Sequence, residues 1–232
     1  MPFISPDWDL LTQIRSLNEK SAHQQEIPPL TICSGRPYPY VEAVAQWLNV
    51  RLPVVFESAG ILHLDNHQIS TNGVFDENAE HQIKELQDWL LAEIITHEEG
   101  MVPEFTKRMD AGLIHPKKVV IQRVYPRIKE YVQKNYSRFE VHDTDVSINI
   151  LIKENNKATG ISDLCELLEI DPSEAAYIGD SSGDIPGLEL VGDPFAPLNA
   201  AQEVKNVAEV MSVESTQAVL TAYERIIERN EG

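Results

Sequence analysis

The fold class follows from the stretch Ala175-Ala176-Tyr177-Ile178-Gly179-Asp180-Ser181-Ser182-Gly183-Asp184, a short apolar run that stops at Gly-Asp and meets a second Asp four residues later. An apolar run ending in a carboxylate is typical of a buried parallel strand, which delivers the acid to the sheet edge where open α/β folds bind ligands. The two carboxylates, Asp180 and Asp184, suit Mg²⁺, which proteins hold through one or two carboxylates with water and phosphate. Taken alone, the same letters are also compatible with a polar turn between a strand and a helix.

Composition narrows the class of protein. The chain has 232 residues, 42% of them apolar, so it can bury a core in one large domain or two small ones. Its net charge of −18 and isoelectric point near 4.7 repel phosphate backbones and anionic membranes, so neither nucleic acid nor a membrane is an expected partner. No apolar stretch approaches the roughly 20 residues of a spanning helix, and the N-terminus lacks a basic-then-apolar signal pattern. A cytoplasmic location is therefore expected.

Cysteine and histidine give no support for a disulfide or a zinc site. Cys33 and Cys165 are far apart and have no CxxC spacing, so both are expected to be core thiols. The seven histidines form no HExxH pattern, which leaves a histidine-ligated metal without support.

Strands alternate with helices in the first part of the chain, and this pattern predicts a parallel sheet with covering helices. A helix is expected to run to about Leu17 with Ser5 as its N-cap and Pro6 at the first helical position. A strand at 30–33, a helix at 40–48 and a strand at 53–56 follow.

The middle of the chain differs and predicts an inserted α/β cap. Amphipathic helices are expected at 76–95 and 123–136, strands at 117–122 and 147–152, and a Gly/Pro/charge-rich stretch near 97–118. The expected domains are a core at 1–73, a cap at 74–152 and a second part of the core at 153–232, with hinges near Asn72-Gly73 and Glu154-Asn155. The alternation then resumes at 161–168, 175–178 and 188–191, and a final helix is expected from about Thr216 to Arg229.

Three further features fall where phosphate chemistry needs them. Ser34 directly follows a predicted strand, so its hydroxyl and the amides of Gly35 and Arg36 are placed to hold a phosphoryl oxygen; the alternative is a plain Ser-Gly turn. Lys157 precedes a helix and can neutralise a phosphoryl group or an acid, or can be a surface lysine. Arg36 can fork onto a phosphate, or pair with Glu57. The chain has no GxxxxGK[ST], GxGxxG or GxSxG motif.

The order of these segments resembles the haloacid dehalogenase (HAD) superfamily of hydrolases, in the Cof-type and sucrose-phosphate-phosphatase-like branch with an α/β cap. The series runs through Cys33-Ser34-Gly35-Arg36-Pro37-Tyr38, Glu57-Ser58-Ala59-Gly60, Asn156-Lys157, the Asp180–Asp184 segment and Asn199-Ala200. The resemblance implies a Rossmann-like parallel sheet core with an inserted α/β cap. It also implies Mg²⁺-dependent hydrolysis of a small, sugar-like phosphate monoester.

The resemblance also assigns roles to residues. Ser34 is then the second-motif hydroxyl that binds the phosphoryl group, with Gly35, Arg36 and Asn199 as further substrate contacts. Lys157 is the third-motif lysine. The fourth-motif acids around Mg²⁺ are Asp180 and Asp184. Where relatives have Glu-Asn-Gly, this chain has Glu57-Ser58-Ala59-Gly60.

One departure from the family pattern is large. The family begins with a strand ending in Asp-x-Asp-Gly, whose first Asp attacks phosphorus and whose second acts as general acid and base. Asp7-Trp8-Asp9 resembles it by letters only, because no apolar strand precedes it and Ser5-Pro6 marks a helix start. Ile4-Ser5-Pro6 instead resembles the helix that follows this motif, so the first motif is expected either ahead of Met1 or lost.

The missing strand has a structural consequence. By resemblance it lies between the strand ending at Cys33 and the one ending at Ile178. Its absence would orphan two rows of backbone groups, each costing about 1–3 kcal/mol if buried and unpaired.

Two other functions remain open. The first is a phosphate-binding or regulatory protein derived from such an enzyme, which makes no covalent intermediate. The second is a dinucleotide-binding oxidoreductase, which the absent glycine fingerprint disfavours.

Overall fold

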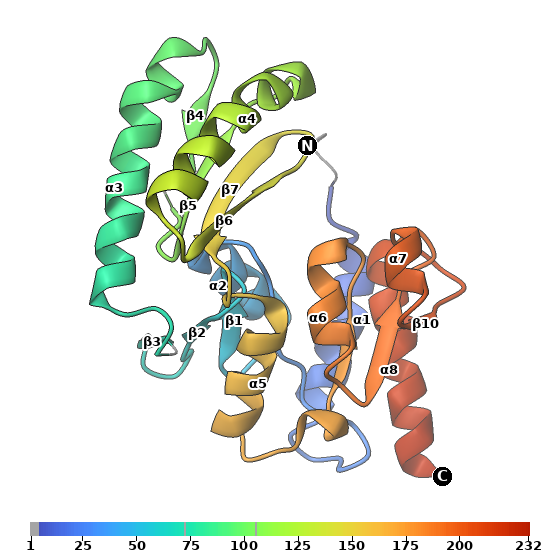
Figure 1. Ribbon diagram of the computed structural model, residues 1–232. Coiled ribbons are helices and arrows are strands. Elements are labelled where there is room, and N and C mark those ends of the chain that lie inside the picture. Colours follow the sequence, from blue (N-terminus) through green and yellow to red (C-terminus); the bar gives the residue numbers. More distant parts are fainter. Residues whose placement is uncertain (1–4, 72, 105) are drawn as a thin grey trace. The chain divides into compact units, whose positions relative to one another are not determined.

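In the computed structural model, which describes residues 5–71, 73–104 and 106–232, the chain forms two compact units (Figure 1). Arg36–Tyr38 and Thr71–Asn155 belong to one, called here the insert unit, and the other described residues form the core unit. Both units combine helices and strands, which confirms the α/β class. Of the residues named as hinges, Asn72 lies outside the described residues, as does Ile4 in the N-terminal comparison. None of the described helices combines the length and apolar character needed to cross a membrane.

The core unit contains two short sheets. The parallel sheet has the order β10-β9-β8, formed by Glu209–Val210, Asp193–Ala196 and Ala176–Ile178. The second sheet has the order β1-β2-β3, formed by Val54–Phe56, Gly60–Leu62 and Ile69–Thr71, with β1 antiparallel to β2; its last residue, Thr71, groups with the insert unit. The strands predicted at 53–56 and 175–178 are therefore present.

The strand predicted at 30–33 is reduced to a single parallel bridge between Cys33 and Val55. Val55 donates its N–H to the Ile32 carbonyl at 2.7 Å, and its carbonyl accepts from Ser34 N–H at 3.0 Å. This pairing is enough to hold Ser34 beside β1, but it is too short for a regular strand.

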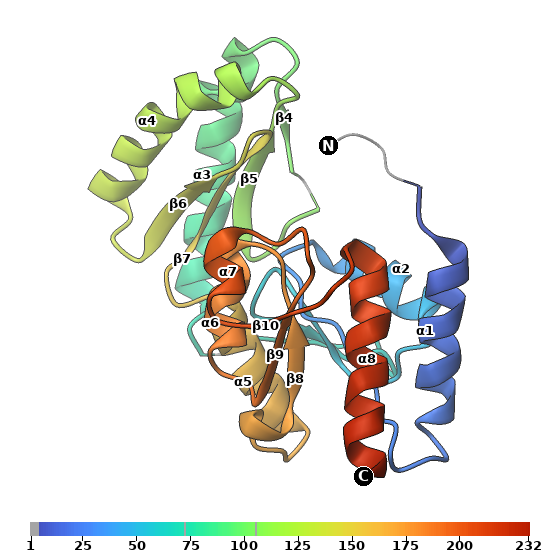
Figure 2. The same cartoon turned by 90° about the vertical axis from the view of Figure 1, so that its right-hand side faces the viewer.

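Five α-helices of the core unit are α1 (Trp8–Lys20), α5 (Lys157–Leu167), α6 (Ile185–Leu188), α7 (Gln202–Lys205) and α8 (Ser215–Glu231). The helices α1, α5 and α8 correspond to helices predicted from the pattern, and α6 and α7 lie beside β8 and β9. Helices α1 and α8 pack side by side (Figure 2). The predicted segment 188–191 forms no element of its own, because Leu188 ends α6 and β9 begins only at Asp193.

The N-cap predicted at Ser5 is wrong. Helix α1 begins at Trp8, and its N-cap is Asp7, whose carboxylate accepts a hydrogen bond from Leu10 N–H at 3.1 Å. An aspartate at this position satisfies an amide that has no partner inside the helix. Helix α2 (Tyr38–Trp47) matches the helix predicted at 40–48.

The insert unit is a four-stranded antiparallel sheet with two helices packed against it (Figure 1). The strand order is β4-β5-β7-β6, with bounds Val102–Pro103, Asp110–Ile114, Ser147–Ile152 and Phe139–Asp143. The helices are α3 (Glu77–Glu93) and α4 (Lys118–Asn135), and a 3₁₀ turn, η1 (Ile95–His97), follows α3. Along β7, Ile148, Ile150 and Ile152 are buried in alternation, as a strand with one covered face requires.

The strand predicted at 117–122 is wrong, because these residues open helix α4. Val119, Val120 and Ile121 form a β-branched run that favours a strand locally. The buried residues of the whole segment recur at helical spacing, at Val120, Ile121, Val124, Ile128 and Val132. The longer period decides the structure, and the Gly/Pro/charge-rich stretch near 97–118 contains strands β4 and β5.

Asp110 is a buried ionisable group at the start of β5. It is 6% exposed, and its Oδ2 accepts a hydrogen bond from Lys107 Nζ at 2.6 Å. Burial raises the pKa of Asp110 to about 6, although the charge and hydrogen bond of Lys107 act in the opposite direction. Ionising Asp110 therefore works against folding of the insert unit.

We predict that the free energy of unfolding contains a part that falls as the pH rises from about 4 to about 6, because the folded state binds the Asp110 proton more tightly than the unfolded chain. Urea unfolding across this range should show that part lost in Asp110→Asn. The control is Asp145→Asn, because Asp145 also pairs with a lysine, Lys118, at 2.7 Å but is 72% exposed. An unchanged pH dependence in Asp110→Asn would contradict the prediction.

Gly160, inside α5, gives a second test of the packing. A Cβ at this position would lie 2.3 Å from the Ser58 carbonyl oxygen and 2.6 Å from Val55 Cγ1. Gly160→Ala should therefore lower the free energy of unfolding by about 2 kcal/mol, although alanine is the better helix former by about 1 kcal/mol. Gly73→Ala, where a Cβ would meet nothing within 4 Å, serves as control in the same denaturation series. Equal stability of the two variants would show that α5 does not approach β1 this closely.

Candidate functional site

The turn after β8 folds the second aspartate of the Gly-Asp-Ser-Ser-Gly-Asp segment back beneath its own backbone. Ser181 caps a 3₁₀ turn, η3 (Ser182–Asp184), and Asp184 N–H donates to the Ser181 carbonyl at 2.8 Å. A Cβ at Gly179 would lie 2.4 Å from Asp184 Cβ, so only glycine leaves room for this approach. Asp184 is consequently 2% exposed.

Five hydrogen bonds surround the Asp184 carboxylate. Its Oδ2 accepts from the N–H groups of Asp180 at 3.1 Å and Ser181 at 2.9 Å, and from Ser181 Oγ at 2.8 Å. Its Oδ1 accepts from Lys157 Nζ and from the Tyr177 hydroxyl, the latter at 2.6 Å. Both oxygens are therefore occupied by the protein itself.

These contacts decide the ionisation of Asp184. Burial acts against the charged form, but the charge and hydrogen bond of Lys157, with the hydrogen bonds of Tyr177 and Ser181, outweigh it and hold the pKa of Asp184 below its usual value. Asp184 is thus a carboxylate, and Lys157 is bound to it as an ion pair.

Lys157 is the first residue of α5, and the helix start is held firmly. The Asn156 side chain accepts from the N–H groups of Ala158 at 2.9 Å and Thr159 at 3.2 Å, which caps the helix. Gly160, one turn further on, packs directly against the Ser58 backbone. The side chain of Lys157 is 16% exposed, so it is not fully enclosed by the protein.

The Ser34 segment lies beside this ion pair. Ser34 is bonded through its backbone to Val55 and to Ser58, whose N–H donates to the Ser34 carbonyl at 3.0 Å. Burial of the Cys33 thiol raises its pKa to about 12, and the charges of Lys157 and Asp184 act on the same thiol. The structure thus brings Lys157 and Asp184 together and places the Cys33 thiol, next to Ser34 in the chain, within reach of their charges.

The loop that faces Ser34 has an unusual backbone. Glu57 and Ser58 have positive φ angles, 44° and 70°, a conformation that asparagine and glycine adopt most easily. Ser58 Oγ lies 3.5 Å from the point where Gly35 would carry a Cβ, so a hydroxyl stands beside the predicted phosphate loop.

The remaining predicted site residues are placed differently. Asp180 is exposed, and its backbone makes the contacts described for it, with Asp184 and with Ala201 N–H at 2.9 Å. Asn199 is also exposed, and its Oδ1 accepts from Ser215 N–H at 3.0 Å, which fixes the start of α8. Arg36 is exposed and groups with the insert unit, so its contact with phosphate stays a prediction.

The residues of the site can bind Mg²⁺ only together with a phosphate group. Across the ranges 5–71, 73–104 and 106–232, no three His, Cys, Asp or Glu side chains are grouped to hold a metal. Asp184 is occupied by five donors, which leaves the exposed carboxylate of Asp180 as the candidate ligand. One carboxylate with water and a substrate phosphate is a known mode of Mg²⁺ binding.

Tyr177 was not predicted as a site residue. It lies two residues before Gly179 in β8, and the apolar run of that strand concealed it among core residues. Burial, the neighbouring Cys33 and the charge of Asp184 raise the pKa of Tyr177 well above its ordinary value, so the hydroxyl remains a donor. The signal that the sequence offered for Tyr177 was an aromatic residue with a polar end in the strand that leads to Asp184.

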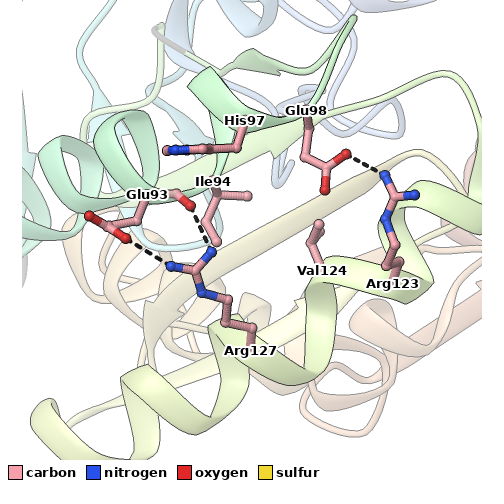
Figure 3. Close-up of a pocket in the computed structure, with 7 residues that line it drawn as sticks. All are labelled: Glu93, Ile94, His97, Glu98, Arg123, Val124 and Arg127. Atoms are coloured by element: carbon pink, nitrogen blue, oxygen red, sulfur yellow. Dashed lines mark hydrogen bonds and ion pairs between the residues drawn. The ribbon is translucent and has the colours of Figure 1, made fainter.

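A pocket in the insert unit is a separate feature (Figure 3). It is lined by Ile94 and Val124 at its apolar base and by charged residues from α3, η1 and α4. Arg127 pairs with Glu93 at 2.8 Å, and Arg123 pairs with Glu98. Since each arginine already binds a glutamate, we do not assign this pocket to phosphate.

The chain is similar to a family of known proteins. The chain matches the family model of haloacid dehalogenase-like hydrolases over residues 93–222. A phosphoglycolate phosphatase of Methanopyrus kandleri is 30% identical over 207 residues, which cover 86% of this chain and 83% of that protein. A phosphoglycolate phosphatase of Methanococcoides burtonii is 24% identical over 228 residues, which cover 96% of this chain and 89% of that protein.

Solved structures share the fold. A protein of Thermoplasma acidophilum superposes with a TM-score of 0.73 at 18% identity, covering 97% of this chain and 90% of its own. The sucrose-phosphatase of Synechocystis, solved with sucrose and phosphate, superposes with a TM-score of 0.64 at 16% identity, covering 96% and 93%.

We predict that the two aspartates differ sharply in their effect on stability. Asp184→Asn should lower the free energy of unfolding by about 3–5 kcal/mol, because it leaves Lys157 without its buried partner. Asp180→Asn, on the exposed side of the same loop, should change it by no more than about 0.5 kcal/mol. Urea denaturation of both variants at pH 7 measures the difference, and similar values for the two would refute the hydrogen-bond network described above.

Proposed function

Because this chain belongs to the haloacid dehalogenase-like hydrolases, we propose that it is a phosphatase whose core unit binds the phosphate group of a small metabolite. The observation that supports this most is the ammonium of Lys157, which a buried carboxylate holds beside the Ser34 segment. A fixed cation next to a hydroxyl and loop amides is the arrangement that neutralises and orients a phosphoryl group.

Mg²⁺ completes the proposed site. Asp180, with the substrate phosphate and water, would hold the ion, which supplies positive charge to the phosphoryl oxygens when bound. Asp184 would act through Lys157, which it holds in place by their ion pair. We propose no direct bond from Asp184 to the metal, because its oxygens already accept five hydrogen bonds.

The substrate class is proposed from the relatives and from the resemblance. The relatives from Methanopyrus kandleri and Methanococcoides burtonii are named phosphoglycolate phosphatases, and the sucrose-phosphatase of Synechocystis has a similar fold. A small phosphate monoester, either a phosphorylated hydroxy acid or a sugar phosphate, is therefore the class to test. The insert unit, proposed as a cap, would choose between them.

The attacking group is the open part of the proposal. The resemblance assigns the attack on phosphorus to the first aspartate of an Asp-x-Asp-Gly segment. The Asp184 carboxylate is fully engaged, and that of Asp7 caps α1, so neither is poised as this nucleophile. These engagements support the second candidate function, a protein that binds a phosphate ester without hydrolysing it.

Two measurements on the 232-residue chain test the proposed phosphate site. Calorimetry with inorganic phosphate and Mg²⁺ should show binding that Lys157→Ala weakens about tenfold or more, because a charged hydrogen bond contributes roughly 1.5–3 kcal/mol. Lys20→Ala, an exposed lysine of the same unit, should bind as the unchanged chain does. Hydrolysis of p-nitrophenyl phosphate, phosphoglycolate and glucose 6-phosphate should be slow.

A fusion that places an apolar segment ending in Asp-x-Asp-Gly ahead of residue 5 should raise the hydrolysis rate and make it depend on Mg²⁺. Absence of hydrolysis in the fusion, with phosphate binding intact, would favour the binding protein. Rapid Mg²⁺-dependent hydrolysis by the 232-residue chain, abolished by Asp7→Asn, would show that Asp7 is the nucleophile after all.

A further inference from the structure

The Tyr177 hydroxyl donates to the same carboxylate oxygen that holds the site lysine. Its distance to Asp184 Oδ1 is 2.6 Å, and Lys157 Nζ binds that oxygen as well. The other oxygen, Oδ2, is fixed by donors of the loop itself. Tyr177 is therefore the one donor to Asp184, among the described residues, that comes from strand β8.

Gly187 leaves the room in which the ring of Tyr177 packs. A Cβ at Gly187 would lie 3.1 Å from the Tyr177 ring and 2.9 Å from Ile161 Cδ1. The ring packs against one apolar cluster that includes Ile161 and Cys165 of α5, and against another that includes Leu188 of α6. It thus connects β8 with both helices that border the site.

Two donors on one oxygen restrict each other. A carboxylate oxygen that accepts from both a hydroxyl and an ammonium has a fixed direction for each, so the tyrosine limits where the lysine can lie. Without the hydroxyl, Oδ1 would interact with the ammonium alone and draw it away from a ligand. We propose that Tyr177 is a positioning residue, which through Asp184 sets the place of the Lys157 ammonium and so the affinity for phosphate. This inference rests on the proposed function of the same site.

Tyr223 offers a matched control. Its hydroxyl also donates at 2.6 Å, to the Pro28 carbonyl, and burial raises its pKa to about 12. It lies in the same unit, on α8, and contacts neither Lys157 nor Asp184 in the hydrogen bonds described for it. Removing this hydroxyl therefore tests the loss of a buried tyrosine hydrogen bond without touching the site.

The experiment compares Tyr177→Phe, Tyr223→Phe and Lys157→Ala in the whole chain, with inorganic phosphate and Mg²⁺ as the probe. Calorimetry should show phosphate binding about five- to tenfold weaker in Tyr177→Phe and unchanged in Tyr223→Phe. The ³¹P chemical shift of bound phosphate should move in Tyr177→Phe and stay unchanged in Tyr223→Phe. In the Lys157→Ala background, Tyr177→Phe should have no further effect, since the tyrosine acts through the lysine.

The outcomes are distinct. If Lys157→Ala weakens binding but Tyr177→Phe does not, the positioning role is wrong and the proposed function stands. If Lys157→Ala binds phosphate normally, both fail together. Additive losses in the double variant would assign Tyr177 a contact of its own with phosphate and overturn the indirect role. Should Tyr177→Phe fail to fold, Gly187→Ala displaces the ring instead, and unchanged phosphate binding there would equally refute the proposal.

Discussion

The buried ion pair between Lys157 and Asp184 is the interaction on which the site depends. A carboxylate that is 2% exposed loses its hydration, which costs several kcal/mol, and the structure offsets this with one cation and four further hydrogen bonds. The donors come from the start of α5, from β8 and from the loop before η3. Each of these segments is therefore positioned by its share in satisfying a single carboxylate, which brings Lys157, Tyr177 and the backbone of Asp180 together in one region of the core unit.

The two acids of the Gly-Asp-Ser-Ser-Gly-Asp segment have opposite environments although they lie four residues apart. The 3₁₀ turn that separates them directs Asp184 inward, where it closes a capping box with Ser181, and leaves Asp180 in solvent. The carboxylate of Asp184 is used in hydrogen bonds within the protein, and that of Asp180 remains available to a hydrated cation. A pair of carboxylates in a sequence thus does not by itself predict a pair of metal ligands. Their hydrogen-bond partners have to be counted first.

Sequence patterns predicted the segments whose local signals agree with their packing. Strand β7 has the predicted bounds, and its three isoleucines are the buried residues of the strand. Helix α3 lies within the amphipathic segment predicted at 76–95 and begins directly after Asp76, which caps it. Helix α4 was missed at its start, since a β-branched run outweighed a helical period that becomes visible only over the full segment. The bonds among Lys157, Tyr177 and Asp184 were not readable, because they join residues up to 27 positions apart and depend on the packing of α5.

The short parallel sheet of the core unit explains why the geometry of the site depends on side-chain hydrogen bonds. A strand inside a parallel sheet is normally buried on both faces, yet Ala176 of β8 is exposed, and β8 pairs with β9 alone among the described strands. The Cys33 segment likewise bonds to β1 through a single bridge. Both nevertheless pack on the same cluster of α5, through Cys33 and Tyr177 against Ile161 and Cys165. Where a continuous ladder would align two strand ends through backbone hydrogen bonds, here α5 and the carboxylate of Asp184 align them, so the geometry of the site is sensitive to the loss of a single side-chain donor.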